Sequence, residues 1–475
     1  MKKPNIGCYK YDIAIFLLFL IVIFIAKLNT LNIPYYWDEM GWTSAAYWLS
    51  DVNLLRSVPG FHDPTTFWGH PPALHVSLAA LFKLFGESIW LSHLLILCFS
   101  FLGVYFTYLL GSFFYGRKAG IFSALFLFFT AIYFAQSGMF LGDIPVTALG
   151  VMSIYFALRK KYIPYLVCAV YMILIKETAI AVVFSLLVYM FLTERPITKC
   201  MLKEVLKYSV PMFVITAFFI SQKITTGKFC CIYPFKFELF ELEPGLVFRQ
   251  SVLITEWLFF YQYRYIFTLL IFLNLIIYKT SRSRKVLLLF FPMFIFSCYS
   301  FSFLYFLPRY LLPAFPYFYI IGAWSLVELI KSKRLQTAVG AIIIALHIYS
   351  LSGTISYGNY EWNMKYLDVV KMHETMCEYI EKEFPYARVL TVFPHTQELS
   401  RPDLGYVNRP LMVYQFKGDT NFRDFNYFDL VLFSAPADSY GDVLRDSALR
   451  SNLNLIKRLE KGNIISELYA VQHPK

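Results

Sequence analysis

The sequence predicts an α-helical polytopic membrane protein that carries a small α/β domain at its C-terminal end. Of its 475 residues, 58% are hydrophobic and only 16% are charged, and the mean hydropathy is +0.54. Soluble domains carry about 25% charged residues, and a chain this apolar needs lipid to cover its surface. These values exclude a soluble enzyme and a disordered protein.

The charged residues are unevenly distributed, which predicts a domain boundary between residues 354 and 355. Residues 355–475 hold 14 Lys/Arg and 16 Asp/Glu, whereas residues 1–354 hold 29 and 15 over a segment almost three times as long. The net charge of +12 therefore comes from the membrane part. Such a balance indicates basic cytoplasmic loops rather than a nucleic-acid partner. The eight cysteines are scattered and predict no disulfide framework.

Apolar runs predict about eleven membrane spans, with thirteen as the upper bound. The runs are residues 12–29, 89–110, 121–136, 143–158, 162–175, 178–193, 208–223, 258–278, 286–305, 311–330 and 336–352. Short basic clusters between them all fall on one side if the N-terminus is cytoplasmic. Loop 30–88, loop 224–257 and the tail from about 353 then lie on the non-cytoplasmic side, so we expect a multi-pass protein of the cell membrane.

Two of these outer segments carry structure of their own. In loop 30–88, residues 42–49 and 74–85 are amphipathic and predict helices at the membrane interface, although the second could instead begin the next span. The tail predicts an α/β domain with helices and strands in alternation. Its predicted elements are a helix at 365–384, strands that begin near 389, 411 and 428, and a helix at 438–451.

Acidic residues at the outer membrane face are the first candidates for chemistry. Asp38-Glu39 follows the first span within a few residues, where a carboxylate can act as a base or bind a cation. The alternative is that Asp38 caps the helix that follows it. Asp143 opens a span from the outside and has the same two interpretations.

Histidines gather in the same outer loop and raise the question of a metal ion. His70 precedes Pro71-Pro72, which fixes its approach. A divalent metal site is an open alternative, but the spacing matches no known ligand motif, and ordinary hydrogen bonding is the favoured interpretation. The residues concerned are His62, His70, His75 and His93, with Asp38, Glu39 and Asp63 nearby.

Two cationic residues, Lys176 and Arg309, complete the set of candidate site residues. Lys176-Glu177 lies between two apolar runs, where a mutually neutralising pair would explain it. Arg309-Tyr310 lies at another outer end, where the alternative is an arginine that extends along the lipid surface to water. Carboxylates and cations from four loops at one membrane face suit a reaction on a lipid-linked phosphate, with a base for the acceptor and cations for the leaving phosphate.

At this point the motifs resemble a known superfamily. The chain is similar to the polytopic GT-C glycosyltransferases, especially the dolichyl-phosphate-mannose protein mannosyltransferases and the bacterial aminoarabinose transferases that modify lipid A. The resemblance runs through most of the first 330 residues. Its carriers are WDE at 37–39, GHPPALHVSLAALFKLFGES at 69–88, GDIPV at 142–146, LIKETAI at 174–180 and PRYLLPAFP at 308–316.

The resemblance implies an inverting glycosyltransferase that uses a polyprenyl-phosphate sugar. Asp38 would be the base that deprotonates an acceptor hydroxyl on a lipid, glycan or protein, and Glu39 would orient Asp38. The predicted contacts to donor phosphate or substrate are His70, Asp143, Lys176, Glu177, Arg309 and Tyr310, with Arg309 first because a guanidinium grips phosphate at two oxygens. The aminoarabinose transferases have a lysine where this chain has His70, which favours the mannosyltransferase-like pattern.

Two other classes remain as alternatives. A transporter or flippase of lipid-linked sugars would carry polar groups near the bilayer midplane and interrupted helices. Here the charges gather at one face instead. A receptor whose tail binds an external ligand would leave Asp38 and His70 without a task.

Overall fold

The computed structural model describes most of the chain. The described residues are 6–61, 64–67, 70–193, 198–227, 244–278, 281–302, 306–353, 360–416, 427–435, 445–446, 453–462 and 464–471. His62, Asp63 and most of the helix predicted at 438–451 lie outside these ranges.

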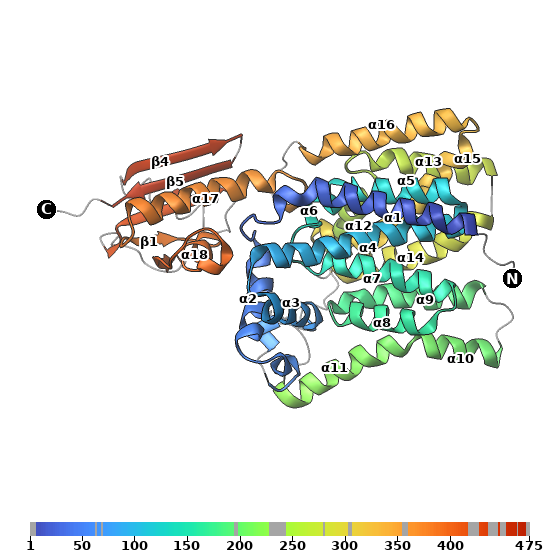
Figure 1. The fold of residues 1–475 in the computed structure, drawn as a ribbon, viewed down its shortest axis with the longest axis horizontal. Coiled ribbons are helices and arrows are strands. Elements are labelled where there is room, and N and C mark those ends of the chain that lie inside the picture. Colours follow the sequence, from blue (N-terminus) through green and yellow to red (C-terminus); the bar gives the residue numbers. More distant parts are fainter. Residues whose placement is uncertain are drawn as a thin grey trace.

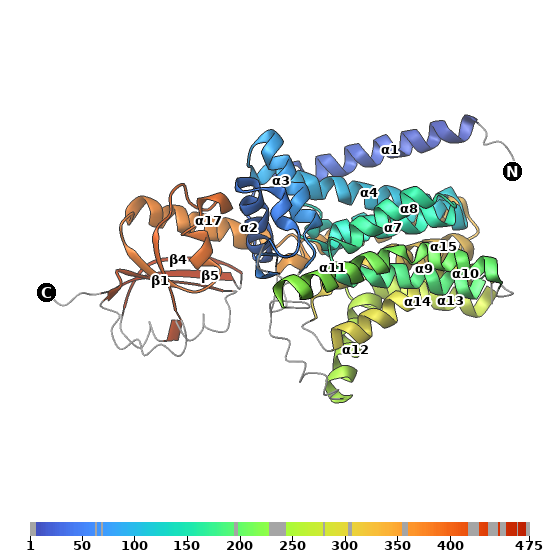
Figure 2. The same ribbon diagram turned by 90° about the horizontal axis from the view of Figure 1, so that it is seen from below.

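A bundle of roughly parallel helices makes up the larger part of the molecule, and a small sheet domain lies beyond one end of it (Figure 1). Two short helices, α2 and α3, lie at the end of the bundle next to that domain, whereas the described N-terminal end of α1 lies at the opposite end (Figures 1 and 2). The helices before the sheet domain are α1 (Ile6–Lys27), α2 (Asp38–Asp51), α3 (Ala73–Phe85), α4 (Ile89–Tyr115), α5 (Arg117–Phe128), α6 (Ala131–Gln136), α7 (Asp143–Leu158), α8 (Tyr162–Ile173), α9 (Ile180–Thr193), α10 (Lys199–Tyr208), α11 (Val210–Thr226), α12 (Pro244–Phe259), α13 (Arg264–Tyr278), α14 (Ser281–Ser302), α15 (Phe315–Leu329) and α16 (Lys333–Leu351).

Each of the eleven predicted apolar runs contains a helix, and α2 and α3 confirm the two helices predicted in loop 30–88. Within the described residues, four helices are long and apolar enough to cross a membrane, or six if each of two bent helix pairs is one span. Five further apolar helices are shorter than this. The predicted helices are therefore confirmed, and the number of spans stays a prediction.

The outer surface of the bundle is apolar, as a lipid-facing surface must be. On α1, the side chains of Leu17, Leu18, Ile21 and Ile25 are all about half exposed or more. In water such a stripe would cost free energy for every exposed apolar side chain, and burial in hydrocarbon removes that cost. The exposed side chains of α1 thus support an integral membrane protein.

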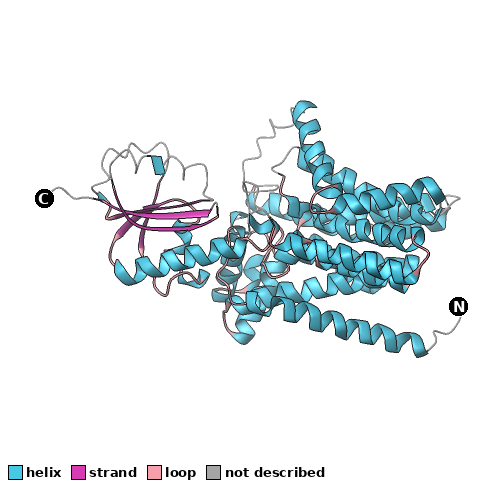
Figure 3. Cartoon of the chain, turned by 90° about the horizontal axis from the view of Figure 1, so that it is seen from above, coloured by secondary structure: helices cyan, strands magenta, loops and turns pink. Residues whose placement is uncertain are grey.

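The C-terminal domain is built as an α/β layer, which Figure 3 shows beside the helical part. Its elements are α17 (Tyr366–Glu383), α18 (His395–Glu398), β1 (Arg388–Thr391), β2 (Met412–Gln415), β3 (Leu430–Ala435), β4 (Asn454–Lys461) and β5 (Ile464–Ala470). The strand order is β2-β1-β3-β5-β4, in which β1 is parallel to both its neighbours and β5 is antiparallel to β3 and β4. The predicted helix at 365–384 and three strands are confirmed, whereas the sequence analysis missed the hairpin β4–β5.

The sheet domain is fastened to the loop that leads into α2. The Tyr35 amide donates a hydrogen bond to the Leu404 carbonyl at 3.1 Å, and the Tyr406 hydroxyl donates to the Tyr35 carbonyl at 3.1 Å. The Trp37 ring meets Phe393 edge-on at 5.1 Å between ring centroids. The position of residues 35–37 is therefore set jointly by the bundle and the sheet domain.

The predicted orientation can be tested by labelling single cysteines with a membrane-impermeant maleimide. Lys161 and Lys382 are both exposed, the first in a basic cluster and the second on α17. If basic clusters are held in the cytoplasm, Lys382→Cys is labelled in intact cells and Lys161→Cys only after permeabilisation. Both variants are made in a chain whose eight native cysteines are changed to serine, because Cys98 and Cys200 are exposed and Cys230 and Cys231 lie in the loop predicted outside; this cysteine-free chain is the control. Labelling of both variants in intact cells would contradict the orientation.

Candidate active site

Asp38 lies at the sharp turn where the chain leaves the first helix and enters α2. It is the first residue of α2, and Trp37 before it has φ 50° and ψ −114°, a region that costs a non-glycine residue about 1–3 kcal/mol. Asp38 is therefore not the helix cap that the sequence analysis left as an alternative. Its side chain, 26% exposed, pairs instead with Arg309.

Arg309 lies at the centre of the site and faces three carboxylates. One terminal nitrogen bonds Asp38 and the other bonds Glu361, while Nε lies 3.3 Å from an oxygen of Asp143. The guanidinium is only 5% exposed, so it does not extend along a lipid surface to water. The carboxylates come from the start of α2, the start of α7 and the 3-10 helix Tyr360–Trp362. One buried cation thus joins three distant parts of the chain.

Lys176 is the second cation of the cluster. Its ammonium nitrogen donates to Asp143 at 2.7 Å and lies 4.2 Å from the centre of the Tyr310 ring. The predicted mutual pair of Lys176 and Glu177 is wrong, because the chain turns between them and directs the two side chains to different partners. The capping interpretation of Asp143 is also wrong, since both its oxygens face cations.

Glu177 instead meets His70 at the open side of the cluster. His70 Nδ1 lies 2.8 Å from a Glu177 oxygen, and the two side chains are 23% and 22% exposed. The His70 ring stacks on Trp42 at 5.5 Å between centroids. Trp42 packs against Gly142, where an added Cβ would lie 2.8 Å from the indole. Gly142 is therefore required for the close approach of α2 to the start of α7.

Glu39 points away from this cluster and into the protein. It is fully buried and accepts hydrogen bonds from the amides of Tyr36 at 3.0 Å and Phe140 at 2.5 Å. His93 lies 3.2 Å from the same carboxylate. The bond to Tyr36 holds the residue before the turn at Trp37, and the bond to Phe140 ties this turn to the segment before α7, so both stabilise the conformation that presents Asp38.

Glu361 is the member of the cluster that the sequence analysis did not find. It is 2% exposed, and its backbone carbonyl accepts a hydrogen bond from the buried Gln136 amide at 3.2 Å. Burial raises the pKa of Glu361 to about 7; Arg309 opposes the rise, and Asp38 and Asp143 add to it. The only signal in the sequence is an acidic residue soon after the last apolar run, which composition assigns to the soluble domain.

The loop histidines that the structure describes do not converge on one point. His70 and His75 both stack on Trp42, whereas His93 lies on the far side of Glu39. Within the described ranges, the group with metal-ligand geometry lies elsewhere, at His373, His395 and Glu398 of the C-terminal domain.

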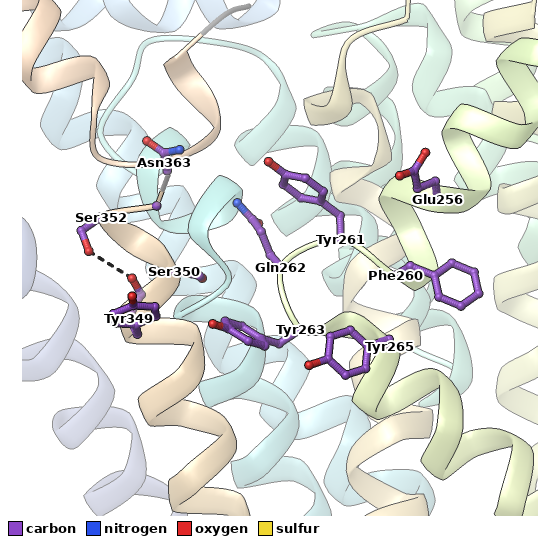
Figure 4. Close-up of a pocket in the computed structure, with 11 residues that line it drawn as sticks. Glu256, Phe260, Tyr261, Gln262, Tyr263, Tyr265, Tyr349, Ser350, Ser352 and Asn363 are labelled. Atoms are coloured by element: carbon purple, nitrogen blue, oxygen red, sulfur yellow. Dashed lines mark hydrogen bonds between the residues drawn. The ribbon is translucent and has the colours of Figure 1, made fainter. Parts of the chain in front are cut away.

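A cavity of about 500 Å³ lies beside the cluster rather than in it. Figure 4 shows tyrosines from the corner between α12 and α13 facing the end of α16 across this space. Asn363 lines it, two residues after Glu361, while none of the predicted site residues does. Its lining residues are Glu256, Phe260, Tyr261, Gln262, Tyr263, Tyr265, Tyr349, Ser350, Ser352, Gly353 and Asn363.

The chain is similar to a known protein family and to solved structures. Residues 69–222 match the family model described as dolichyl-phosphate-mannose-protein mannosyltransferase. No curated protein matches the sequence. Among solved structures, ArnT from Cupriavidus metallidurans in the apo state has a TM-score of 0.58 at 15% identity, over 95% of this chain and 97% of that chain. The same protein bound to undecaprenyl phosphate has a TM-score of 0.54 at the same identity and coverage. The predicted resemblance to the GT-C glycosyltransferases is thereby confirmed.

Removal of the central cation should destabilise the protein. Arg309→Met leaves Asp38 and Glu361 without their cation and Asp143 with Lys176 alone, and loss of one member of a buried ion pair costs about 3–5 kcal/mol. We expect a lower unfolding temperature in detergent, followed by circular dichroism. Lys382→Met, which removes an exposed lysine from an ion pair with the exposed Glu383, is the control and should change it far less. Equal shifts in the two variants would contradict the central role of Arg309.

The raised pKa of Glu361 predicts a pH dependence of stability. Below about pH 7 the folded protein binds a proton at Glu361, whereas the unfolded chain binds it only near its ordinary pKa of about 4.3. The folded state is therefore favoured as the pH falls from about 8 to about 5, and this contribution is lost as the pH rises again. In thermal melts between about pH 5 and about pH 8, Glu361→Gln should lack this pH-dependent gain in stability. Parallel profiles of unfolding temperature against pH in the two proteins would refute the prediction.

Proposed function

For a chain that matches the mannosyltransferase family over residues 69–222 and shares the ArnT fold, we propose the transfer of a sugar from a polyprenyl-phosphate donor to a hydroxyl acceptor at the non-cytoplasmic face of the membrane. The observation that carries the proposal is the cluster of Asp38, Arg309, Lys176 and Asp143 beside α2 and α3. It combines a partly exposed carboxylate with two buried cations. Sugar transfer from a lipid phosphate uses a carboxylate as the base for the acceptor hydroxyl and cations to stabilise the leaving phosphate.

In this proposal Asp38 is the base. It accepts the proton of the acceptor hydroxyl while the acceptor oxygen forms a bond to the anomeric carbon of the sugar. The bond from that carbon to the phosphate oxygen breaks, and polyprenyl phosphate leaves with the electron pair, so the anomeric configuration inverts. Asp38 suits the role because it is the most exposed acid of the cluster, at 26% against 5% for Asp143 and 2% for Glu361.

The donor phosphate would compete with the carboxylates for Arg309. Arginine and lysine bind phosphate by charge-assisted hydrogen bonds, and the guanidinium can hold two oxygens at once. Once the phosphate takes a terminal nitrogen of Arg309, Asp38 loses its ion-pair partner and is free to accept a proton. Donor binding and activation of the base would thus be coupled through one side chain.

The remaining predicted residues have supporting roles in this mechanism. Glu39 is a positioning residue that holds the turn before Asp38, and Asp143 orients Lys176 and Arg309. Tyr310 lies under both cations, 4.2 Å and 5.6 Å from its ring centre. The pair of His70 and Glu177 lies at the open side, where it can contact the sugar or the phosphate.

A transporter or flippase of lipid-linked sugars is the alternative. Alternating access needs a polar binding site near the midplane, reached in turn from the two sides. The three carboxylates and two cations described above are instead grouped around α2, at the end of the bundle next to the C-terminal domain (Figure 1). That position favours chemistry at one membrane face over transport.

The proposal is tested with the full chain in nanodiscs and a panel of polyprenyl-phosphate sugars. Release of polyprenyl phosphate reports turnover, and thermal stabilisation reports donor binding. Asp38→Asn should lower turnover by roughly 10²–10⁴-fold, the usual contribution of a general base, and keep the stabilisation by donor. Asp51→Asn, at the exposed far end of α2, is the matched control and should keep both.

Two results would count against the proposal. Full turnover in Asp38→Asn would remove Asp38 as the base. Movement of an intact donor across the bilayer of proteoliposomes, with no cleavage by the wild type in the presence of sugar acceptors, would favour the transporter.

A further inference from the structure

The core of the C-terminal domain contains a second group of ionisable side chains, remote from Arg309. His373 of α17 and His395 and Glu398 of α18 are at most 1% exposed, and one potential ligand atom from each lies within 4.8 Å of the others. Figure 1 places α18 beside α17 in this domain. Burial of two imidazoles and a carboxylate without water is costly unless each is paired. The group therefore requires an explanation that packing does not supply.

The hydrogen bonds around His395 fix which of its nitrogens carries the proton. Nε2 lies 2.7 Å from the Ser434 hydroxyl, and that hydroxyl donates its own hydrogen to Ser466 at 2.6 Å. Ser434 must then accept from His395, which places the ring hydrogen on Nε2. In the neutral ring, Nδ1 carries a lone pair.

That lone pair faces a carboxylate. His395 Nδ1 lies 2.5 Å from Oε2 of Glu398, but within the described part of the chain neither atom has a hydrogen-bond partner. His373 Nδ1 lies 2.9 Å from the other carboxylate oxygen, and its Nε2 is also buried without a partner there. Two acceptor atoms in contact repel each other unless a cation binds both.

A proton on His395 Nδ1 is the simpler cation, and it would make one imidazolium beside the Glu398 carboxylate. That charge would lie in a buried site next to the His373 ring, 4.3 Å away between ring centroids. A divalent metal ion uses the same lone pairs and leaves both rings neutral. Two histidines and a glutamate form an established zinc ligand set, and a ligand histidine usually donates its other ring N–H to an acceptor, as His395 does to Ser434.

We propose that His373, His395 and Glu398 bind a divalent transition-metal ion, zinc by ligand type, in the core of the C-terminal domain. A water molecule would take the fourth position, as in zinc sites with three protein ligands. The ion connects α18 to α17.

Such a site has a structural consequence for the region around Asp38. The segment that follows α18 carries Leu404 and Tyr406, which make the two hydrogen bonds to Tyr35 described above. An ion that fixes α18 therefore also fixes the segment on which the turn before Asp38 rests. The site is a structural clamp between the sheet domain and the entrance of α2.

The test measures metal directly, in the full chain purified in detergent without chelators. We expect about one zinc ion per chain by mass spectrometry, and visible d–d absorption after exchange for cobalt(II). Glu398→Gln and His395→Gln should lose the ion, whereas His347→Gln, a buried histidine of α16, should retain it.

Ser434→Ala keeps the test valid if the ligand variants fail to fold. Loss of the hydroxyl that accepts from His395 Nε2 should weaken metal affinity roughly 10–100-fold, measured by competition with a chromogenic chelator. Folded wild-type protein that carries no stoichiometric metal and gives no cobalt spectrum would overturn the proposal. Unchanged affinity in Ser434→Ala, or zinc retained in a folded Glu398→Gln, would also overturn it.

Discussion

The guanidinium of Arg309 is the constraint on which the site depends. It sits where three carboxylates from separate parts of the chain meet, and its side chain is almost completely excluded from solvent. A buried charge is tolerated only when it is paired, so the starts of α2 and α7 and the segment with Glu361 must all reach the same point. Packing of apolar helices alone would leave their relative heights in the bundle free to vary. The ion pairs fix them.

The same constraint connects the helical bundle to the C-terminal domain. Glu361 lies between α16 and α17, and the contacts of Tyr35 and Trp37 with the sheet domain hold the other end of the cluster. The strained backbone at Trp37 is held by Glu39, which accepts hydrogen bonds from the Tyr36 amide before the turn and from the Phe140 amide before α7. Asp38 is thus presented by a turn that neither domain would maintain by itself.

The proposed mechanism depends on the ion pair between Arg309 and Asp38. In that mechanism Asp38 would stay paired until the donor phosphate competes for the guanidinium. Lys176 does not replace Arg309 as the ion-pair partner of Asp38, since it is bound to Asp143 and lies over the Tyr310 ring. The chemistry and the binding of a phosphate would therefore be controlled by a single exchange of partners.

The sequence by itself determined the helical membrane class, the α/β tail, the ordered motifs, and which residues carry charge at the ends of the apolar runs. These are local properties, because hydropathy and periodicity act over one helix or strand. Only the tertiary structure decided the pairing of those charges. Lys176 and Glu177 are neighbours that bind different partners, and Asp38 and Arg309 are 271 positions apart and bind each other.

Glu361 shows the same limit most clearly. It lies in the segment whose composition is that of a soluble domain, yet its side chain is buried against Arg309. No local pattern records that contact, since it arises from how the end of α16 returns toward α6 and how much free energy a buried, unpaired arginine would cost. Sequence fixes which side chains can pair, and the packing of distant segments selects which of them do.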